Sequence, residues 1–75
     1  MVLVFGDVVP HVADMMRVID AEFEEMPGMR LTEAQVRRLW NLSLPDAEAV
    51  LGHMCRMGRL VRDETGRYFR QRFDN

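Results

Sequence analysis

The side chains that could do chemistry in this chain are few, and their spacing does not favour catalysis. His53 and Cys55 are two residues apart on an expected helix, so they point to different faces and cannot chelate one metal ion. His11 and Asp14 are three residues apart at the start of another helix, where such a pair is more often a helix-end interaction than a catalytic one. The run Glu22-Glu24-Glu25 is typical of a solvated helix face.

The single cysteine offers neither a disulfide nor an activated nucleophile. Only Arg56 and Arg59 stand near Cys55 as groups that would lower its pKa, so we expect a half-buried, inert thiol in a reducing compartment. The chain has no Gly-rich phosphate loop and no Ser/His/Asp set in a motif context. We therefore expect no enzymatic activity, no bound metal and no cofactor.

A helix over residues 43–57 is expected to organise the fold. Ser43 is a good N-cap, Pro45 stands early enough that its missing N–H does no harm, and Gly58 ends the helix. One face is committed to a core by apolar residues at helical spacing, namely Ala47, Val50, Leu51, Met54 and Met57. The opposite face is left for solvent or a partner and carries Glu48, Ala49, Gly52, His53 and Arg56.

A second helix, over residues 32–41, is expected just before it, because Thr32 and Gln35 form a capping-box pair. Its inward face is expected to consist of Val36, Leu39 and Trp40, with Leu42 just beyond. The connection of two or three residues forces the two helices to cross steeply.

After Gly58, two β-prone runs around a short polar loop predict a hairpin over residues 59–70, with Gly66 in the left-handed conformation.

Residues 31–70 resemble the winged helix-turn-helix domains of bacterial regulators, and are similar also to small stand-alone winged-helix proteins of unassigned role. The likeness rests on L-T-x-x-Q, on the turn N-L-S-L-P-D and on the closing M-G-R-L-V-R-D-E-T-G-R-Y-F-R. It implies an α+β, mostly α fold with three helices, a C-terminal β-hairpin wing, and a third strand from the link Met29-Arg30-Leu31. Many members of this class bind DNA with the third helix in the major groove; others bind only proteins.

The first part of the chain is expected to supply a helix over residues 10–26. Its apolar residues fall at spacings of three and four, namely Val12, Met15, Met16, Ile19, Phe23 and Met26. Pro27-Gly28 stops it. Before it, the run Val2-Leu3-Val4-Phe5 predicts a strand, which either packs on its own domain or pairs with another copy.

Composition indicates one domain, residues 1–75, because 75 residues with 48% hydrophobic content bury only a thin core. No apolar run approaches the ~20 residues of a membrane span, and no signal peptide opens the chain, so we expect a cytoplasmic protein without a membrane partner.

The charge is asymmetric: six carboxylates against one arginine give residues 1–27 a net charge of −5. Residues 52–75 carry six arginines against three carboxylates, a net charge of +3 that suits phosphate.

The resemblance thus implies a small regulator-like protein that binds double-stranded DNA weakly or as a dimer. The residues expected to contact DNA are Ser43, Glu48, Gly52, Arg56, Arg62, Thr65 and Arg67. One feature opposes this function, because Asp46 and Glu48 bring two carboxylates to the end of the third helix that should meet base edges.

The alternative is a protein-interaction or homodimerisation module that binds no DNA. The exposed surface of the third helix is expected to be small and apolar, with Leu44, Pro45, Ala49 and Gly52 in line. The run at residues 2–5 offers a second apolar edge. The interface is expected to include Val2, Val4, Leu44 and Ala49. No small-molecule substrate is evident, since a chain this short has little room for a concave pocket.

Overall fold

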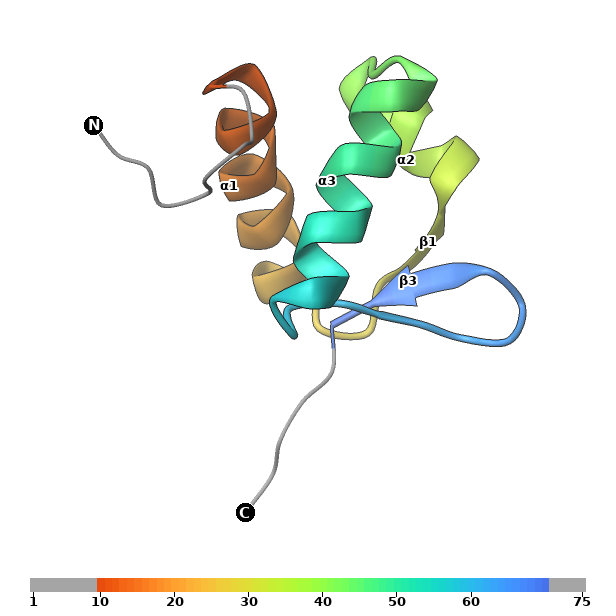
Figure 1. Ribbon diagram of the computed structural model, residues 1–75. Helices are drawn as coiled ribbons and strands as arrows, with labels where there is room; N and C mark the ends of the chain where they lie inside the picture. Colours follow the sequence, from red (N-terminus) through yellow and green to blue (C-terminus); the bar gives the residue numbers. More distant parts are fainter. Residues whose placement is uncertain (1–9, 71–75) are drawn as a thin grey trace.

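The computed structural model describes residues 10–70, which form three helices and a three-stranded antiparallel sheet (Figure 1). The elements in chain order are α1 (Pro10–Glu25), β1 (Arg30–Thr32), α2 (Glu33–Trp40), α3 (Leu44–Arg56), β2 (Val61–Arg62) and β3 (Arg67–Phe69). The predicted strand at residues 2–5, with Val2 and Val4, lies outside the described residues. The element order confirms the expected mostly helical α+β fold, a winged helix-turn-helix with a third strand before α2.

The starts of α2 and α3 are set by the predicted capping residues. Thr32 Oγ1 accepts a hydrogen bond from the Gln35 backbone N–H at 3.2 Å, and Gln35 Oε1 accepts one from the Thr32 N–H at 2.8 Å. Ser43 Oγ accepts from the Asp46 backbone N–H at 3.2 Å. Each cap supplies an acceptor to an N–H that has no partner within the first turn, which stabilises such a helix by about 1 kcal/mol. The helices begin one residue after their caps, at Glu33 and Leu44.

The turn between α2 and α3 depends on Asn41, a residue that the sequence did not single out. Asn41 is in the left-handed region, with φ 54° and ψ 52°, and its N–H donates to the Arg37 carbonyl. Asparagine is among the few non-glycine residues that adopt this conformation readily. The Leu42 N–H donates to the same carbonyl at 2.9 Å, and the reversal turns the Leu42 side chain into the core.

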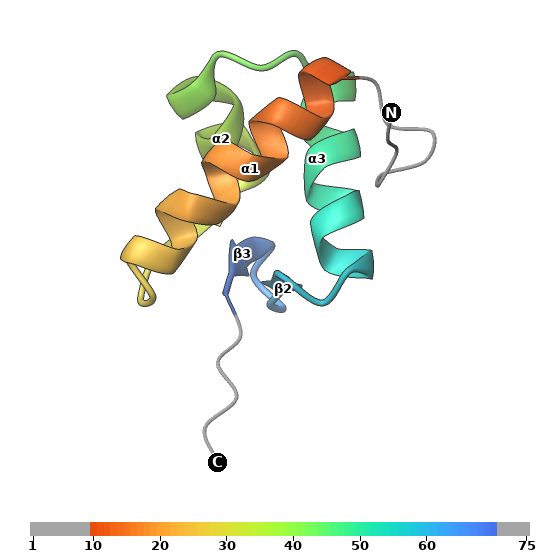
Figure 2. The ribbon, with the colours of Figure 1, turned by 90° about the vertical axis from the view of Figure 1, so that its left-hand side faces the viewer.

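The sheet has the order β1-β3-β2, so the last strand in sequence is the central one. Leu31 pairs with Tyr68, which pairs in turn with Arg62 on β2. These three side chains share one face of the sheet, because side chains in register lie on the same side. The neighbouring residues of each strand, including Arg30 and Phe69, lie on the other face. Figure 2 shows the three helices on one side of the hairpin.

The core lies between the three helices and the sheet, and the largest side chains buried in it are Phe23, Ile19, Leu51, Met54, Leu60, Val36 and Val50. Three apolar residues that were expected to face inward are exposed, and those predictions were wrong: Leu39 is 60% exposed, Met57 48% and Met26 54%. Met26 and Met57 stand just beyond the last residues of α1 and α3. The residues of this segment that contact the core are Val36, Trp40 and Leu42.

No helix within residues 10–70 is long and apolar enough to cross a membrane.

Candidate nucleic-acid interface

The C-terminal half of α3 presents an arginine over a glycine. Arg56 stands on the last turn of α3, and its guanidinium lies back along the helix over Gly52. A Cβ placed on Gly52 would lie 3.5 Å from Arg56 Nη1, an ordinary van der Waals contact. The Arg56 guanidinium therefore covers the half-buried Gly52 and places a cationic group on this face of α3.

Arg62 joins this cluster from the hairpin. Its guanidinium carbon lies 6.0 Å from the centroid of the Tyr68 ring, at the outer limit of a cation–π contact. Burial raises the pKa of the Cys55 thiol, and the charges of Arg62 and Arg56 partly offset this, so both arginines lie near that thiol. The half-buried, inert Cys55 expected from the sequence therefore has Arg62 beside it rather than the predicted Arg59.

The pKa of Tyr68 depends on the burial of its phenol and on nearby charges. Burial raises the pKa of its phenol, Arg62 lowers it, and the charges of Glu33 and Glu48 add to the rise. Glu48 is exposed on the outward side of α3. Among the seven predicted DNA contacts, Gly52 and Arg56 thus lie together on α3, Arg62 lies near the Tyr68 ring, and Glu48 is exposed on α3.

The wing tip is built around Asp63. Its Oδ1 accepts hydrogen bonds from the Thr65 hydroxyl at 2.6 Å, the Thr65 N–H at 2.9 Å and the Arg67 N–H at 3.0 Å. Its Oδ2 accepts one from Arg30 Nη1 on β1 at 3.0 Å. These donors, with the Thr65 hydroxyl foremost, lower the pKa of Asp63 to about 2. The Thr65 hydroxyl thus donates a hydrogen bond within the turn, whereas the sequence predicted that Thr65 contacts DNA.

The remaining predicted contacts lie apart from the cluster around Tyr68. Arg67 pairs with Thr32 in the sheet register, so its side chain starts from the face of β3 opposite to Tyr68, although it is exposed beside the wing tip. Ser43 stands thirteen residues before Arg56, which is about 20 Å away along a helix at 1.5 Å per residue. The structure therefore places Ser43 at the far end of α3, where its hydroxyl caps the helix.

The Asp46 carboxylate does not point along the outward face of α3. Its Oδ2 lies 3.4 Å from His11 Nε2 on α1, and the Asp46 side chain is 35% exposed. His11 had been paired with Asp14 in the sequence analysis; instead, Asp14 forms an ion pair with Arg17 within α1. Of the two carboxylates expected to oppose DNA binding, only Glu48 remains directed away from the helix bundle.

Nine arginines lie within residues 10–70, and four of them are ion-paired. Arg17, Arg30, Arg59 and Arg70 form ion pairs with aspartates of the same molecule. The other five form none with any residue that the structure describes: Arg37 and Arg38 stand on α2, and we call the remaining three, Arg56, Arg62 and Arg67, the α3–wing arginines. They are all exposed, and they stand on the last turn of α3 and on the two strands of the hairpin.

The predicted protein-interface residues on α3 differ in exposure. Leu44 is 42% exposed at the first residue of α3, whereas Ala49 is half-buried against the core. The exposed Leu39 lies on the other side of the turn that joins α2 to α3. The apolar surface near this turn therefore consists of two leucines, one from each helix of the pair.

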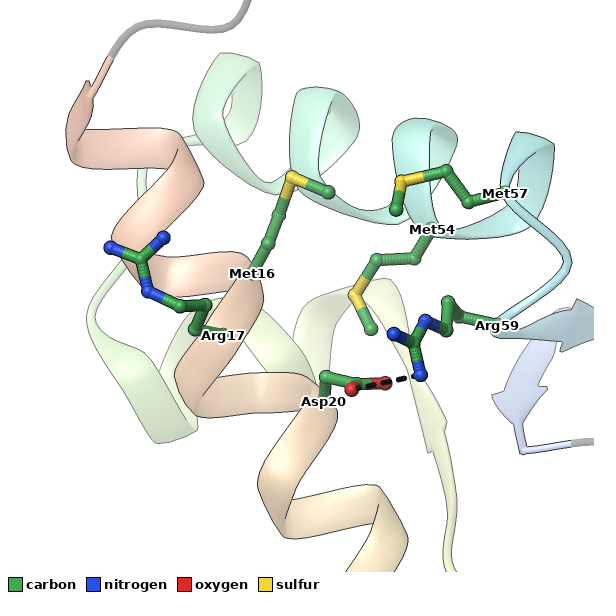
Figure 3. A pocket seen from close by; sticks show the side chains of 6 residues that line it. All are labelled: Met16, Arg17, Asp20, Met54, Met57 and Arg59. Carbon is green, nitrogen blue, oxygen red and sulfur yellow. Dashed lines mark ion pairs between the residues drawn. The ribbon is translucent and has the colours of Figure 1, made fainter. Parts of the chain in front are cut away.

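A shallow hollow lies between α1 and the end of α3 (Figure 3). It encloses about 300 Å³, much of it open to solvent, and it is lined by Met16, Arg17, Asp20, Met54, Met57 and Arg59. The one carboxylate in this lining, that of Asp20, is ion-paired with Arg59 and Arg70. Among residues 10–70, no three histidine, cysteine or carboxylate side chains are grouped so that they could hold a metal ion.

Sequence reasoning missed the residues that organise this interface, chiefly Asp63, Tyr68 and Asp20. Asp63 could have been found, because an aspartate two residues before a threonine and three before a glycine is typical of a turn closed by its own side chain. Asp20 and its partner Arg70 are fifty residues apart, and no local pattern indicates that they meet.

Comparison of the chain with known protein families, with curated proteins and with solved structures finds no match in any of the three.

Proposed function

We propose that this protein binds double-stranded DNA through the outward face of α3 and the wing, with the α3–wing arginines contacting phosphates. One observation carries the proposal: Arg56, Arg62 and Arg67 are exposed, have no ion-pair partner among residues 10–70, and stand on the last turn of α3 and on the hairpin. The two other unpaired arginines of this range, Arg37 and Arg38, stand on α2. Arginine presents a planar fork of donors that matches phosphate. The winged helix-turn-helix architecture supports the same reading, because in helix-turn-helix domains the second helix of the pair enters the major groove.

The orientation of Asp46 removes part of the electrostatic objection. Because its carboxylate lies beside His11 on α1, the start of α3 is less acidic toward a ligand than the sequence implied. Glu48 stays exposed, and the whole chain carries a net charge of −2. Binding is therefore expected to be weak and strongly dependent on salt.

Base recognition is expected to be limited. Gly52 has no side chain with which to read a base edge, and Glu48 could accept a hydrogen bond only from the amino group of cytosine. Arg56 stands at the end of α3, beside the wing, where a phosphate contact is easier than a base contact. The protein should therefore distinguish duplex sequences poorly.

The test is fluorescence anisotropy on a labelled mixed-sequence duplex as the salt concentration is raised. Three phosphate contacts predict a slope of log affinity against log salt of about −2.7, or roughly a 40-fold loss between 50 and 200 mM. Arg56→Gln, Arg62→Gln and Arg67→Gln should each reduce the magnitude of that slope by about 0.9. Arg17→Gln removes the same charge from α1, where the arginine is paired, and should leave the slope unchanged.

Two results would overturn this proposal. One is the absence of binding at about 100 μM protein and low salt, where non-specific DNA binding is ordinarily detectable. The other is equal loss of affinity in Arg17→Gln and in the three α3–wing variants, because that would show a response to net charge alone.

A second function, self-association without DNA, is favoured by the two leucines at the α2–α3 turn. Leu39 at 60% and Leu44 at 42% exposure place large apolar side chains on both sides of the turn. Sedimentation velocity over a range of concentrations tests this function. It predicts a concentration-dependent dimer that Leu39→Ser with Leu44→Ser abolishes, and a monomer at all concentrations would exclude it.

A further inference from the structure

Asp20, in the middle of α1, holds two arginines that flank the wing. Its Oδ2 lies 3.3 Å from Arg59 Nη1, and its Oδ1 accepts a hydrogen bond from Arg70 Nη1 at 2.8 Å. Figure 3 shows the Asp20 carboxylate facing the Arg59 guanidinium across the hollow between α1 and the end of α3. One carboxylate thus pairs with two cations through its two oxygens, and this arrangement restricts the direction of both arginine side chains.

The two arginines lie at the two ends of the hairpin. Arg59 follows Gly58 and stands two residues before β2, and Arg70 directly follows β3. Asp20 therefore joins the chain entering the wing and the chain leaving it to the same point on α1. The hairpin is also attached by the pairing of β3 with β1, by the Arg30–Asp63 ion pair at its tip and by the Arg30 guanidinium 4.1 Å from the centroid of the Phe69 ring. Leu60 is buried in the core, and Tyr68 packs against the core.

The surroundings of Asp20 strengthen these pairs. The side chains of Asp20 and Arg70 are 22% and 21% exposed, and Met16 and Met54 are buried beside them in the lining of the hollow. Charges that are partly shielded from water interact more strongly and are less screened by salt than fully exposed ones. The Arg59 side chain, at 46% exposed, forms the more solvated half of the arrangement.

We propose that Asp20 is a positioning residue for the wing, which sets the placement of the hairpin, and with it Arg62 and Arg67, relative to α3. This inference rests on the proposed function for its effect on DNA, but not for its effect on the hairpin. The β2–β3 pairing covers only two residue pairs, so the direction of the hairpin depends on contacts outside it, and Asp20 supplies two of these at its base.

The variant Asp20→Asn separates positioning from simple charge, because the two predict opposite signs. Removing a carboxylate makes the protein more positive, so an effect of charge alone would tighten DNA binding. If Asp20 positions the wing, the affinity for the mixed duplex falls by about threefold or more despite the added positive charge. Asp14→Asn is the matched control: it makes the same change on the same helix, where the partner is Arg17 within α1, and its affinity should rise or stay unchanged.

Hydrogen exchange supplies a readout that does not need DNA. The Asp63 N–H donates across the hairpin to the Arg67 carbonyl at 2.8 Å. In Asp20→Asn this amide should exchange about tenfold faster or more. Amides in the middle of α3 should keep their rates in Asp20→Asn and in Asp14→Asn, since local opening is set by local contacts. Arg70→Gln, which removes the partner in place of the carboxylate, should accelerate the same amide.

The outcomes separate the two ideas. Faster exchange of the Asp63 amide in Asp20→Asn, with no DNA binding by the parent protein or by the variant, would support positioning and refute the proposed function. Unchanged exchange at Asp63 in both Asp20→Asn and Arg70→Gln would refute positioning, whatever the DNA affinity. If Asp20→Asn does not fold, Arg70→Gln alone decides: faster exchange of the Asp63 amide supports positioning, and unchanged exchange refutes it.

Discussion

Replacing Gly58 by alanine should destabilise the protein through backbone strain alone. Gly58 follows the C-cap of α3 with φ +77°, a conformation that a side chain with a Cβ rarely adopts. Its N–H donates to the Cys55 carbonyl at 3.0 Å, and the next N–H, of Arg59, donates to the Met54 carbonyl at 2.8 Å. These bonds end α3 and turn the chain into the wing, so the conformation of Gly58 cannot relax without breaking them.

The cost can be assigned because no steric contact contributes. A Cβ at Gly58 would meet nothing within 4 Å, so the expected loss is the cost of the left-handed conformation, about 1–2 kcal/mol. Gly28 is the matched control, since a Cβ there also meets nothing within 4 Å and its φ lies outside the left-handed region. Gly28→Ala should be neutral or stabilising by up to about 1 kcal/mol, because it restricts only the unfolded chain.

Thermal and urea unfolding followed by circular dichroism measure both variants. For a domain of this size each kcal/mol corresponds to about 4–8 °C in Tm. Gly58→Ala should therefore melt clearly below the parent protein, Gly28→Ala at or above it, and Gly58→Asn between Gly58→Ala and the parent. Equal stability of the two alanine variants would refute the assignment of Gly58 as a left-handed helix terminus.

Three further predictions concern the wing, the core and the thiol. Because the pKa of Asp63 is lowered from 3.8 to about 2, its contribution to stability is complete above pH 4 and disappears as the pH falls toward 2; Asp63→Ala should lose this part of the acid dependence in pH-dependent unfolding. Val36→Ala, at a fully buried site, should cost about 1–3 kcal/mol in urea unfolding, whereas Leu39→Ala should cost less than about 1 kcal/mol; the opposite order would contradict the exposure of Leu39. Because burial raises the pKa of Cys55, its thiol should react with a disulfide reagent more slowly in the folded protein than in urea at pH 8, and equal rates would contradict that environment.

The parts of the fold that the sequence predicted are those set by local chemistry. Two helix starts are specified by side chains close in sequence. Thr32 and Gln35 each accept a hydrogen bond from the other's backbone N–H, and Ser43 accepts one from the N–H of Asp46. Gly58 and Gly66 have the positive φ angles that were expected of them. Local signals of this kind depend only on neighbours in sequence, so they can be read without knowledge of the packing.

The parts that the sequence did not predict depend on contacts between distant segments. Leu39 has the type and spacing of a core residue, yet it is exposed, whereas Leu42, just beyond the left-handed turn at Asn41, is buried. Asp46 looked like an obstacle to DNA until its carboxylate was found beside His11, thirty-five residues earlier. Charge sums along the sequence cannot distinguish Arg59, held by Asp20, from Arg62, which is directed to the surface.

The most direct test of the proposed interface is a ¹H–¹⁵N NMR titration of the protein with a short mixed-sequence duplex at low salt. We expect the largest chemical-shift changes at the amides of Arg56, Arg62 and Arg67 and at their neighbours on α3 and the wing, with α1 unaffected. Changes confined to α1, or to the α2–α3 turn around Leu39 and Leu44, would contradict the assignment of the α3–wing arginines as the DNA-binding surface.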